Sequence, residues 1–406
     1  MKQFLLLVVL VLGLSPTTCF ASSWQQVAAL TISGCSECIS GLAVSPSGNT
    51  VVLAIDSTVL LYEKPAMGWT DAANPTTLLT CSDPSVFAIG VEAYGVATND
   101  GTVIGEAYKN VSGGQETQVL LVWQEPTDGW GSQQSVSQSF ELEATSPAHP
   151  WNSVAVDAHT ITVGDRSDTD ATGAVYVWNN PPDTHFSIAK LTASDGKYAD
   201  QLGWTLSLSG DTVTTGTCPE SGYDRQGAIY IFVKPSTGWR TSTQTAELKY
   251  PPDDRIGFGC YIASNSDTVA AGDPAYNNDE GRIEIFEKPS SGWSDSSTPT
   301  AQIKGSSSTG PDFGITVNFG GKSAGDEMLV ASSPDFNGND AAENIYYKPK
   351  QGWGSIRNSP NQTILDPDPD HLDLNGRDGA GANTVVFADC TAGGGCGSPV
   401  HVYQYK

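Results

Sequence analysis

Oxygen-bearing side chains alternate along one stretch of the chain in a pattern that suits a hard cation. In DFNGNDAAE the first, third, fifth and ninth positions are Asp335, Asn337, Asn339 and Glu343. Calcium in proteins takes about six to eight oxygen ligands, and short loops supply them at alternating positions. Asp340 stands where such loops usually have glycine. The spacing predicts a calcium site, and the competing interpretation is ordinary turn chemistry of Asp and Asn.

A second acidic cluster supplies further candidate calcium ligands near the end of the chain. Its members are Asp368, Asp370, Asp373, Asn375 and Asp378. Smaller groups of the same kind are Asp168-x-Asp170 and the set Asp273, Asn277 and Asp279. Turn chemistry competes with metal binding in these stretches too. Calcium is the cofactor that these patterns predict.

Recognisable catalytic signatures are missing from the sequence. The five histidines stand at 149, 159, 185, 371 and 401, outside any HExxH or triad setting. His371 has Asp370 and Asp373 nearby, which a solvated acidic loop explains. A nucleophile elbow, a P-loop or a dinucleotide fingerprint would need a strand–turn–helix context, and the mature chain shows no helical period. We therefore predict no catalytic residue, and expect that the protein is not an enzyme.

The N-terminus and the charge indicate export. Residues 1–21 resemble a secretory signal peptide, with Lys2, an apolar run at 4–14 and cleavage after Ala21. No later apolar run reaches the roughly 18 residues of a membrane span. The net charge of −25 would repel nucleic acid and anionic membranes. We expect one domain over 22–406 that is secreted or at the cell surface, is a monomer and does not insert into membranes.

Seven cysteines remain after this cleavage: Cys35, Cys38, Cys81, Cys218, Cys260, Cys390 and Cys396. Export permits disulfides, and an odd number leaves at least one thiol unpaired. The pairs nearest in sequence are Cys35 with Cys38, and Cys390 with Cys396. The Cys-x-x-Cys at 35–38 could also indicate redox or zinc chemistry, but the second ligand pair that zinc needs is absent. Asn110 and Asn361 begin glycosylation sequons, which matter in a eukaryotic host.

A recurring motif, KP-x-x-G-W, organises the elements that must position these residues. It reads EKPAMGW at 63–69, and related copies end at Trp130, Trp239, Trp293 and Trp353, with a degenerate copy at 180–186. Each unit reads as four short strands separated by turn residues, the all-β signature. The stretch WQQVAAL (24–30) matches the strand that the last unit lacks. This predicts seven four-stranded antiparallel blades closed into a β-propeller by residues 24–30.

The repeated tryptophans could stack on carbohydrate, but residues at one position of nearly every blade are expected to pack blades together. The aromatic residues outside the repeat are better candidates for a ligand surface: Trp151, Trp204, Tyr94 and Tyr108.

Several units resemble FG-GAP repeats, which build the seven-bladed propeller of integrin α subunits. The motifs are DRIGFG (254–259) with AGDP (271–274), and PDFG (311–314) with ASSP (331–334). LGW (202–204) is a further copy, in which Trp204 is interpreted as replacing the phenylalanine. The family's calcium loop, D-x-D-x-D-G-x-x-D between the first two strands of a blade, is not matched by the short turns here. The resemblance implies a propeller and extracellular recognition.

From these patterns we expect a secreted, non-enzymatic binding or adhesion module for an extracellular protein or glycan, with possible help from calcium. One alternative is an exported lyase or hydrolase acting on polysaccharide at the mouth of the propeller channel. Another is a structural protein of the envelope or matrix.

Overall fold

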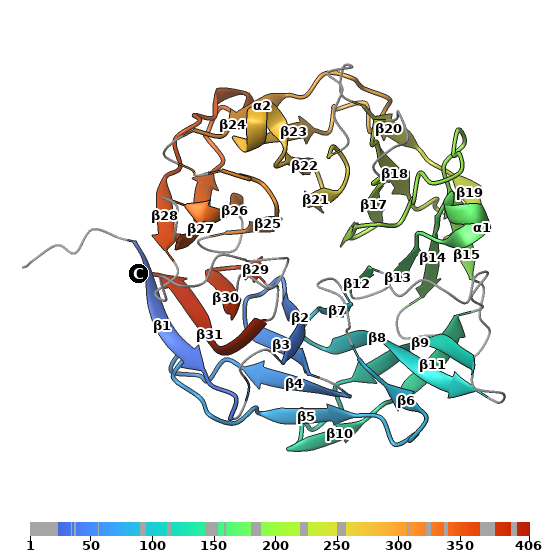
Figure 1. Ribbon diagram of the computed structural model, residues 1–406, viewed down its shortest axis with the longest axis vertical. Coiled ribbons are helices and arrows are strands. Elements are labelled where there is room, and N and C mark those ends of the chain that lie inside the picture. Colours follow the sequence, from blue (N-terminus) through green and yellow to red (C-terminus); the bar gives the residue numbers. More distant parts are fainter. Residues whose placement is uncertain are drawn as a thin grey trace, which may run out of the picture.

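Short alternating strands form seven antiparallel blades around a ring, as the sequence predicts (Figure 1). The computed structural model describes residues 23–33, 35, 38–55, 57–89, 95–111, 115–142, 153–157, 160–179, 188–219, 226–249, 257–306, 309, 311–321, 326–336, 340–365, 378–390 and 396–406. The predicted signal peptide lies outside these residues.

The first four blades follow one another along the chain, and their strands run from the innermost to the outermost. Blade 1 comprises β2 (Ile39–Val44), β3 (Thr50–Ile55), β4 (Thr58–Glu63) and β5 (Thr77–Thr80). Blade 2 comprises β7 (Val96–Thr98), β8 (Thr102–Val111), β9 (Gln115–Gln124) and β11 (Gln138–Leu142), and β6 (Val86–Phe87) also pairs with β8. Blade 3 comprises β12 (Val154–Val156), β13 (Thr160–Asp165), β14 (Ala174–Asn179) and β15 (Ala189–Thr192). Blade 4 comprises β16 (Leu206–Ser209), β17 (Thr212–Gly216), β18 (Ile229–Val233) and β20 (Ala246–Leu248).

The last three blades complete the ring. Blade 5 comprises β21 (Tyr261–Ser264), β22 (Thr268–Asp273), β23 (Arg282–Glu287) and β24 (Ala301–Lys304). Blade 6 comprises β25 (Val317–Gly320), β26 (Met328–Phe336), β27 (Asp340–Tyr347) and β28 (Gln362–Leu365). Blade 7 comprises β29 (Asp378–Gly381), β30 (Thr384–Cys390), β31 (Cys396–Tyr405) and β1 (Trp24–Leu30). The short helical turns are α1 (Asp168–Ala171), α2 (Tyr276–Asp279) and η1 (Trp353–Ser355).

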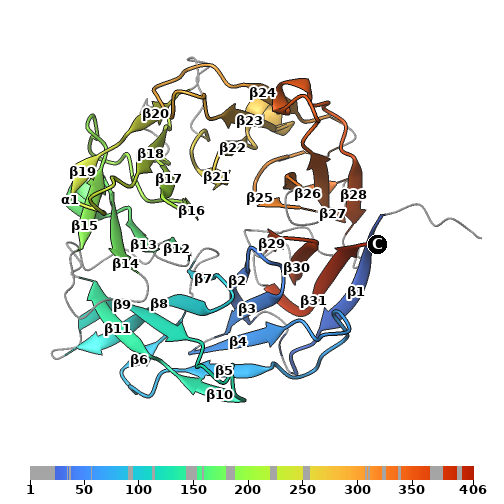
Figure 2. The same cartoon turned by 180° about the vertical axis from the view of Figure 1, so that it is seen from behind.

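The two ends of the described chain close the ring. Strand β1 pairs antiparallel with β31 from Trp24 opposite Tyr405 to Leu30 opposite Val400, and both views show them side by side (Figures 1 and 2). Blades 1 and 7 also meet where Ile39 pairs with Cys396. Each innermost strand contacts the innermost strands of both neighbouring blades. The predicted closure by residues 24–30 is therefore confirmed.

The apolar core lies between the blades. One cluster joins Val52 and Leu61 of blade 1 to Val103 and Trp123 of blade 2, all of them fully buried. Equivalent clusters fill the other six seams. Because burying one such side chain contributes about 1.5–3 kcal/mol, the seams are the main source of stability.

The KP-x-x-G-W motif makes a tight turn and fastens it to the blade. In all five copies the glycine N–H donates to the proline carbonyl, at 2.8 or 2.9 Å, and the glycine has a positive φ of 89° to 101°. The residue before each proline donates its N–H to the turn between the first two strands, as Lys288 does to Asp267 (2.7 Å). The tryptophan then packs in a seam, as Trp69 does between blades 7 and 1. Its predicted packing role is confirmed.

Outer strands are covered by the blade that follows. Short strands β10 (Gln133–Ser135) and β19 (Ser242–Thr243), which come just after a motif tryptophan, pair in parallel with β5 and β15. Ser296 does the same beside Leu248 of β20, and Ala72 beside Leu30 of β1. These contacts protect sheet edges that could otherwise pair with another chain.

Candidate functional site: the loop face

The two faces of the ring are built differently. One face, here called the turn face, carries the connections between the first and second strands and between the third and fourth strands of each blade. The other, the loop face, carries the connections between the second and third strands and those that lead into the next blade. In the five blades that carry the KP-x-x-G-W motif, the turn-face connections repeat the same hydrogen bonds. Loop-face connections vary, from a short link between β3 and β4 to the segment between Gly216 and Ile229.

Loop-face segments of neighbouring blades are joined by backbone hydrogen bonds. Gln201 donates its N–H to Ala171 (2.9 Å), and Asp312 donates to Asp279 (2.6 Å). These hydrogen bonds hold the described loop-face backbone across the seams between blades 3 and 4 and between blades 5 and 6. All the predicted acidic stretches belong to loop-face connections or to the strand ends beside them.

Two turns on this face have unusual backbones. Three consecutive residues have positive φ in blade 3 (Thr169, Asp170 and Ala171) and again in blade 5 (Asn277, Asn278 and Asp279). Such conformations cost free energy in residues other than glycine, although Asn and Asp tolerate them best. Asp170 and Asn277 are exposed at these turns, so polar side chains project from blades 3 and 5.

The predicted acid Asp168 is part of a buried ion pair. Lys190 Nζ lies 2.6 Å from its carboxylate, and the hydroxyls of Thr169 (2.5 Å) and Tyr176 also donate to it. Burial favours the neutral form, but these donors outweigh burial and hold the pKa of Asp168 below its ordinary value. The carboxylate is therefore engaged inside blade 3.

Asp273, the last residue of β22 in blade 5, is also buried. Its carboxylate lies 3.0 Å from Arg282, which also contacts Glu284 at 2.5 Å. The Arg282 guanidinium lies 4.1 Å from the centre of the Tyr276 ring. The structure therefore uses Asp273 in a buried charge network rather than at the surface.

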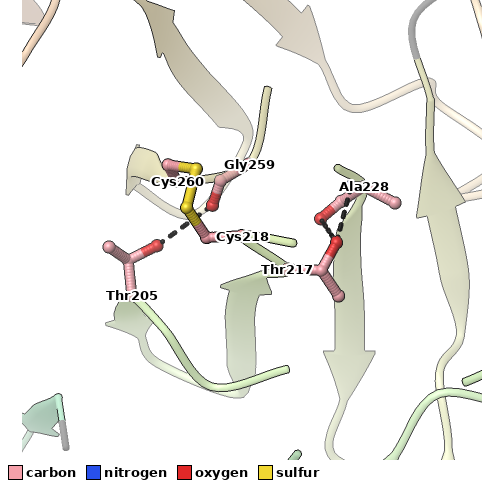
Figure 3. Close-up of a disulfide and its surroundings, with 6 residues drawn as sticks. All are labelled: Thr205, Thr217, Cys218, Ala228, Gly259 and Cys260. Atoms are coloured by element: carbon pink, nitrogen blue, oxygen red, sulfur yellow. Dashed lines mark hydrogen bonds between the residues drawn. A yellow bond between two sulfur atoms is a disulfide. The ribbon is translucent and has the colours of Figure 1, made fainter. Parts of the chain in front are cut away.

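In each of the three seams that contain FG-GAP motifs, the residue after the motif glycine faces a residue of the preceding blade. The pair of side chains at this position differs from seam to seam. Arg166 lies over the Trp204 ring at 4.4 Å between blades 3 and 4. At the corresponding position between blades 4 and 5, Cys218 and Cys260 form a disulfide (Figure 3). Pro274 and Ile315 stand there between blades 5 and 6. The Cys218–Cys260 pairing was not predicted, because only the alignment of adjacent blades brings these residues together.

This alignment corrects the interpretation of Trp204. The isolated pairing of Gly173 with Leu202 matches that of Gly281 with Phe313, so Leu202 takes the phenylalanine position. Leu202 is fully buried, as Phe313 is. Trp204 follows the glycine of the motif and has Arg166 on its ring, whereas Tyr108 packs beside Phe87 at 5.9 Å. Trp151 and Tyr94 lie outside the described residues.

The predicted calcium ligands are only partly described. Asp335 is in β26, and Glu343 is a buried residue of β27 opposite Ser332 and Ile364. Asn337 and Asn339 lie outside the described residues, as do Asp368, Asp370, Asp373 and Asn375. Over the described part of the chain, no group of three or more His, Cys, Asp or Glu side chains could hold a metal ion. Calcium binding at these residues stays a prediction.

Asp378, the described member of the second cluster, bridges two blades. It begins β29, and its Oδ2 accepts hydrogen bonds from the Thr316 hydroxyl (2.8 Å) and from Asn318 Nδ2 (2.6 Å) in blade 6. Its side chain is 7% exposed, and burial raises its pKa to about 6. Along the innermost strands, the ionisable side chains are those of Tyr261 and Asp378.

The cysteines agree with the predicted disulfide chemistry. Cys35 and Cys38 form a disulfide with each other. Cys396 of β31 is also disulfide-bonded, and it stands opposite Cys390 of β30 in the register of these two strands. Cys81 is a free thiol. Disulfides persist in oxidising compartments, which agrees with export. Among the described residues, no helix has the length and apolar character to cross a membrane.

Comparison with known proteins agrees with the geometry of the seams. The family model of the FG-GAP repeat matches residues 186–232. This range includes Leu202 and Gly203, all of β16 and β17, and all of β18 except its last residue, Val233. No curated protein matches the chain.

Proposed function

We propose that this chain, which contains an FG-GAP repeat at residues 186–232, is an exported, non-enzymatic binding module whose loop face recognises an extracellular protein or glycan. The contrast between the two faces carries this proposal. In repeat proteins the binding surface usually comprises the connections that vary between repeats. The turn face repeats one pinned turn, whereas the loop face changes from blade to blade.

Exposed side chains on the loop face suit recognition. Tyr198, in the connection from blade 3 to blade 4, is 57% exposed, and a tyrosine offers both an apolar ring and a polar hydroxyl to a partner. Asp170 and Asn277 project from the turns of blades 3 and 5 on either side of it. The backbone beneath them is held by bonds across the seams, which reduces the ordering cost of binding.

The described innermost strands offer no pair of carboxylic acids along the channel wall. Glycoside hydrolysis uses a pair of carboxylic acids. The innermost strands contribute one carboxyl group, Asp378, and its Oδ2 already accepts two hydrogen bonds from blade 6.

Calcium belongs to this proposal as a stiffening ion at the two acidic stretches of the loop face, Asp335–Glu343 and Asp368–Asp378. Its support is the spacing of oxygen ligands in the sequence.

A binding screen tests the proposal. The purified protein is applied to arrays of glycans and extracellular proteins, once in calcium and once in chelator. Saturable binding without product release is expected, and its loss in chelator would assign the acidic stretches to calcium. Tyr198→Ala should weaken binding about tenfold or more, the scale on which aromatic contacts count at interfaces. The matched control is Met67→Ala at a turn-face tip, where the side chain is 95% exposed. Steady release of a cleaved product would refute the proposal and favour the enzyme.

A further inference from the structure

The segment between β1 and β2 spans the closure of the ring. Strand β1 is the outermost strand of blade 7, and β2 is the innermost strand of blade 1. Between them, Thr31 donates its N–H to Ala72 (2.8 Å), and Ile32 donates to the Ser398 hydroxyl (2.7 Å). The Cys35–Cys38 disulfide lies in this segment and ends one residue before Ile39, which pairs with Cys396.

The described disulfides differ in accessibility. Cys35 and Cys38 are both partly exposed, whereas in the Cys218–Cys260 pair only Cys218 is partly exposed and Cys260 is 5% exposed in the seam of blades 4 and 5. Cys396, which is also disulfide-bonded, is 1% exposed. Thiol–disulfide exchange requires a thiolate to reach a sulfur atom, so accessible disulfides react first.

The disulfides also differ in the length of chain that they close. Cys35 and Cys38 are three residues apart, and Cys218 and Cys260 are 42 apart. In the chain-entropy model a cross-link that closes a longer loop removes more entropy from the unfolded chain, so Cys218–Cys260 should contribute more to the stability of the fold than Cys35–Cys38. The fold should therefore tolerate the opening of Cys35–Cys38 better than the opening of Cys218–Cys260.

We propose that Cys35–Cys38 is a redox-sensitive clasp on the closure of the propeller, which a dithiol reductant opens before the Cys218–Cys260 disulfide. One thiolate of the reductant attacks a sulfur of the pair and forms a mixed disulfide, with the other cysteine leaving as a thiolate. The second reductant thiol then displaces the remaining cysteine. The products are two cysteine thiols and the oxidised, cyclic disulfide of the reductant.

Opening the clasp loosens the ends of two strands. Ile32, Cys35 and Cys38 pack against the buried cluster between blades 7 and 1, which includes Leu30 and Ile39. Once the cross-link is gone, the segment samples more conformations, and the pairing of Leu30 with Val400 and of Ile39 with Cys396 becomes easier to break. The other six seams keep their contacts, so the response is confined to the closure.

Graded reduction of the full protein tests this order. The protein is equilibrated with increasing dithiothreitol, free thiols are alkylated, and peptides are quantified by mass spectrometry. Cys81 is a free thiol before any reductant is added, so the alkylation of its peptide serves as the reference for complete labelling. Cys35 and Cys38 should become alkylated at lower reductant concentrations than Cys218 and Cys260, because exposed disulfides are the labile ones. Simultaneous opening, or earlier opening of Cys218–Cys260, would overturn the proposal.

Hydrogen exchange tests the consequence. When Cys35–Cys38 is open and Cys218–Cys260 is closed, amide exchange in Trp24–Leu30 should be up to about twentyfold faster than in the oxidised protein. The variant C35S/C38S should show this faster exchange without reductant, and C218S/C260S should keep the oxidised rate in β1. If either variant does not fold, the titration of the natural protein still decides. Unchanged exchange in β1 after opening would show that the disulfide is not a clasp.

Discussion

The backbone of Gly216 in blade 4 lies directly against the carbonyl of Gly259 in blade 5. A Cβ atom added to Gly216 would stand 1.7 Å from that oxygen. The same contact joins Gly272 to Gly314, where the distance would be 1.9 Å, and a related contact joins Gly164 to Gly203. The two glycines of the repeat are therefore the two sides of one seam, which explains why one lies at or beside the end of the second strand of a blade and the other just before the first strand of the next blade.

Gly216→Ala should destabilise the protein strongly. The new methyl group collides with backbone atoms, which cannot move without opening the seam, so we expect a loss of about 3 kcal/mol. The midpoint of urea unfolding measures it. Gly131→Ala is the matched control, because its Cβ would meet the end of the Gln134 side chain at 3.5 Å. Equal effects of the two changes would contradict the proposed role of the glycine contact.

Trp353→Phe should reduce stability without reducing ligand binding. Trp353 is fully buried, and its indole N–H donates to Glu327 at 2.7 Å, so the change removes a hydrogen bond to a charged group worth about 1.5–3 kcal/mol. Thermal unfolding measures the loss, and the array measures binding. A variant that is as stable as the natural protein but binds glycan poorly would restore the carbohydrate-stacking interpretation of the repeated tryptophans.

The sequence was sufficient to predict the ring because its local signals agree with each other. The five Pro-x-x-Gly turns mark the same point in five blades, and residues 24–30 complete the last blade in the observed register. Partners across a seam were harder to predict. Assigning Cys218 to Cys260, or Leu202 to the phenylalanine position, requires knowing how one blade is placed against the next.

Asp378→Asn should make stability less dependent on pH. Burial raises the pKa of Asp378 to about 6, whereas an unfolded Asp titrates near about 3.9. The folded state therefore holds its proton more tightly, and this group's contribution to stability falls as pH rises between these values, by about 3 kcal/mol in all. Asn keeps an oxygen acceptor for Thr316 without the buried charge. Urea midpoints from pH 4 to pH 8 should fall less steeply in the variant, and parallel profiles would refute this assignment.

Asp168→Asn should have the opposite pH signature. The native pKa of Asp168 is lowered, so its contribution is present above the ordinary carboxyl pKa and is lost as pH falls through the native value. At pH 7 we expect the variant to be less stable by about 2 kcal/mol, because Lys190 loses a charged partner. The difference should shrink in acid. Asp170→Asn, at the exposed tip of the same turn, is the control with little expected effect.

The acidic stretches show where sequence reasoning could not distinguish the roles of similar side chains. Asp168 and Asp273 look alike in the sequence as polar loop acids, yet both are buried in ion pairs with Lys190 and Arg282. The cations come from neighbouring strands, and nothing in the local spacing indicates them. Asp378 likewise depends on donors from blade 6, which stand far from it in the chain.

The most direct test of the account is to block one face at a time. In a Cys81→Ser background, a maleimide polyethylene glycol is attached to Asp170→Cys on the loop face or to Met67→Cys on the turn face, and affinity for the ligand found in the array is measured. The account predicts that the loop-face adduct raises the Kd at least about tenfold, which is about 1.4 kcal/mol, while the turn-face adduct leaves it unchanged. Loss of binding with the turn-face adduct alone would contradict it.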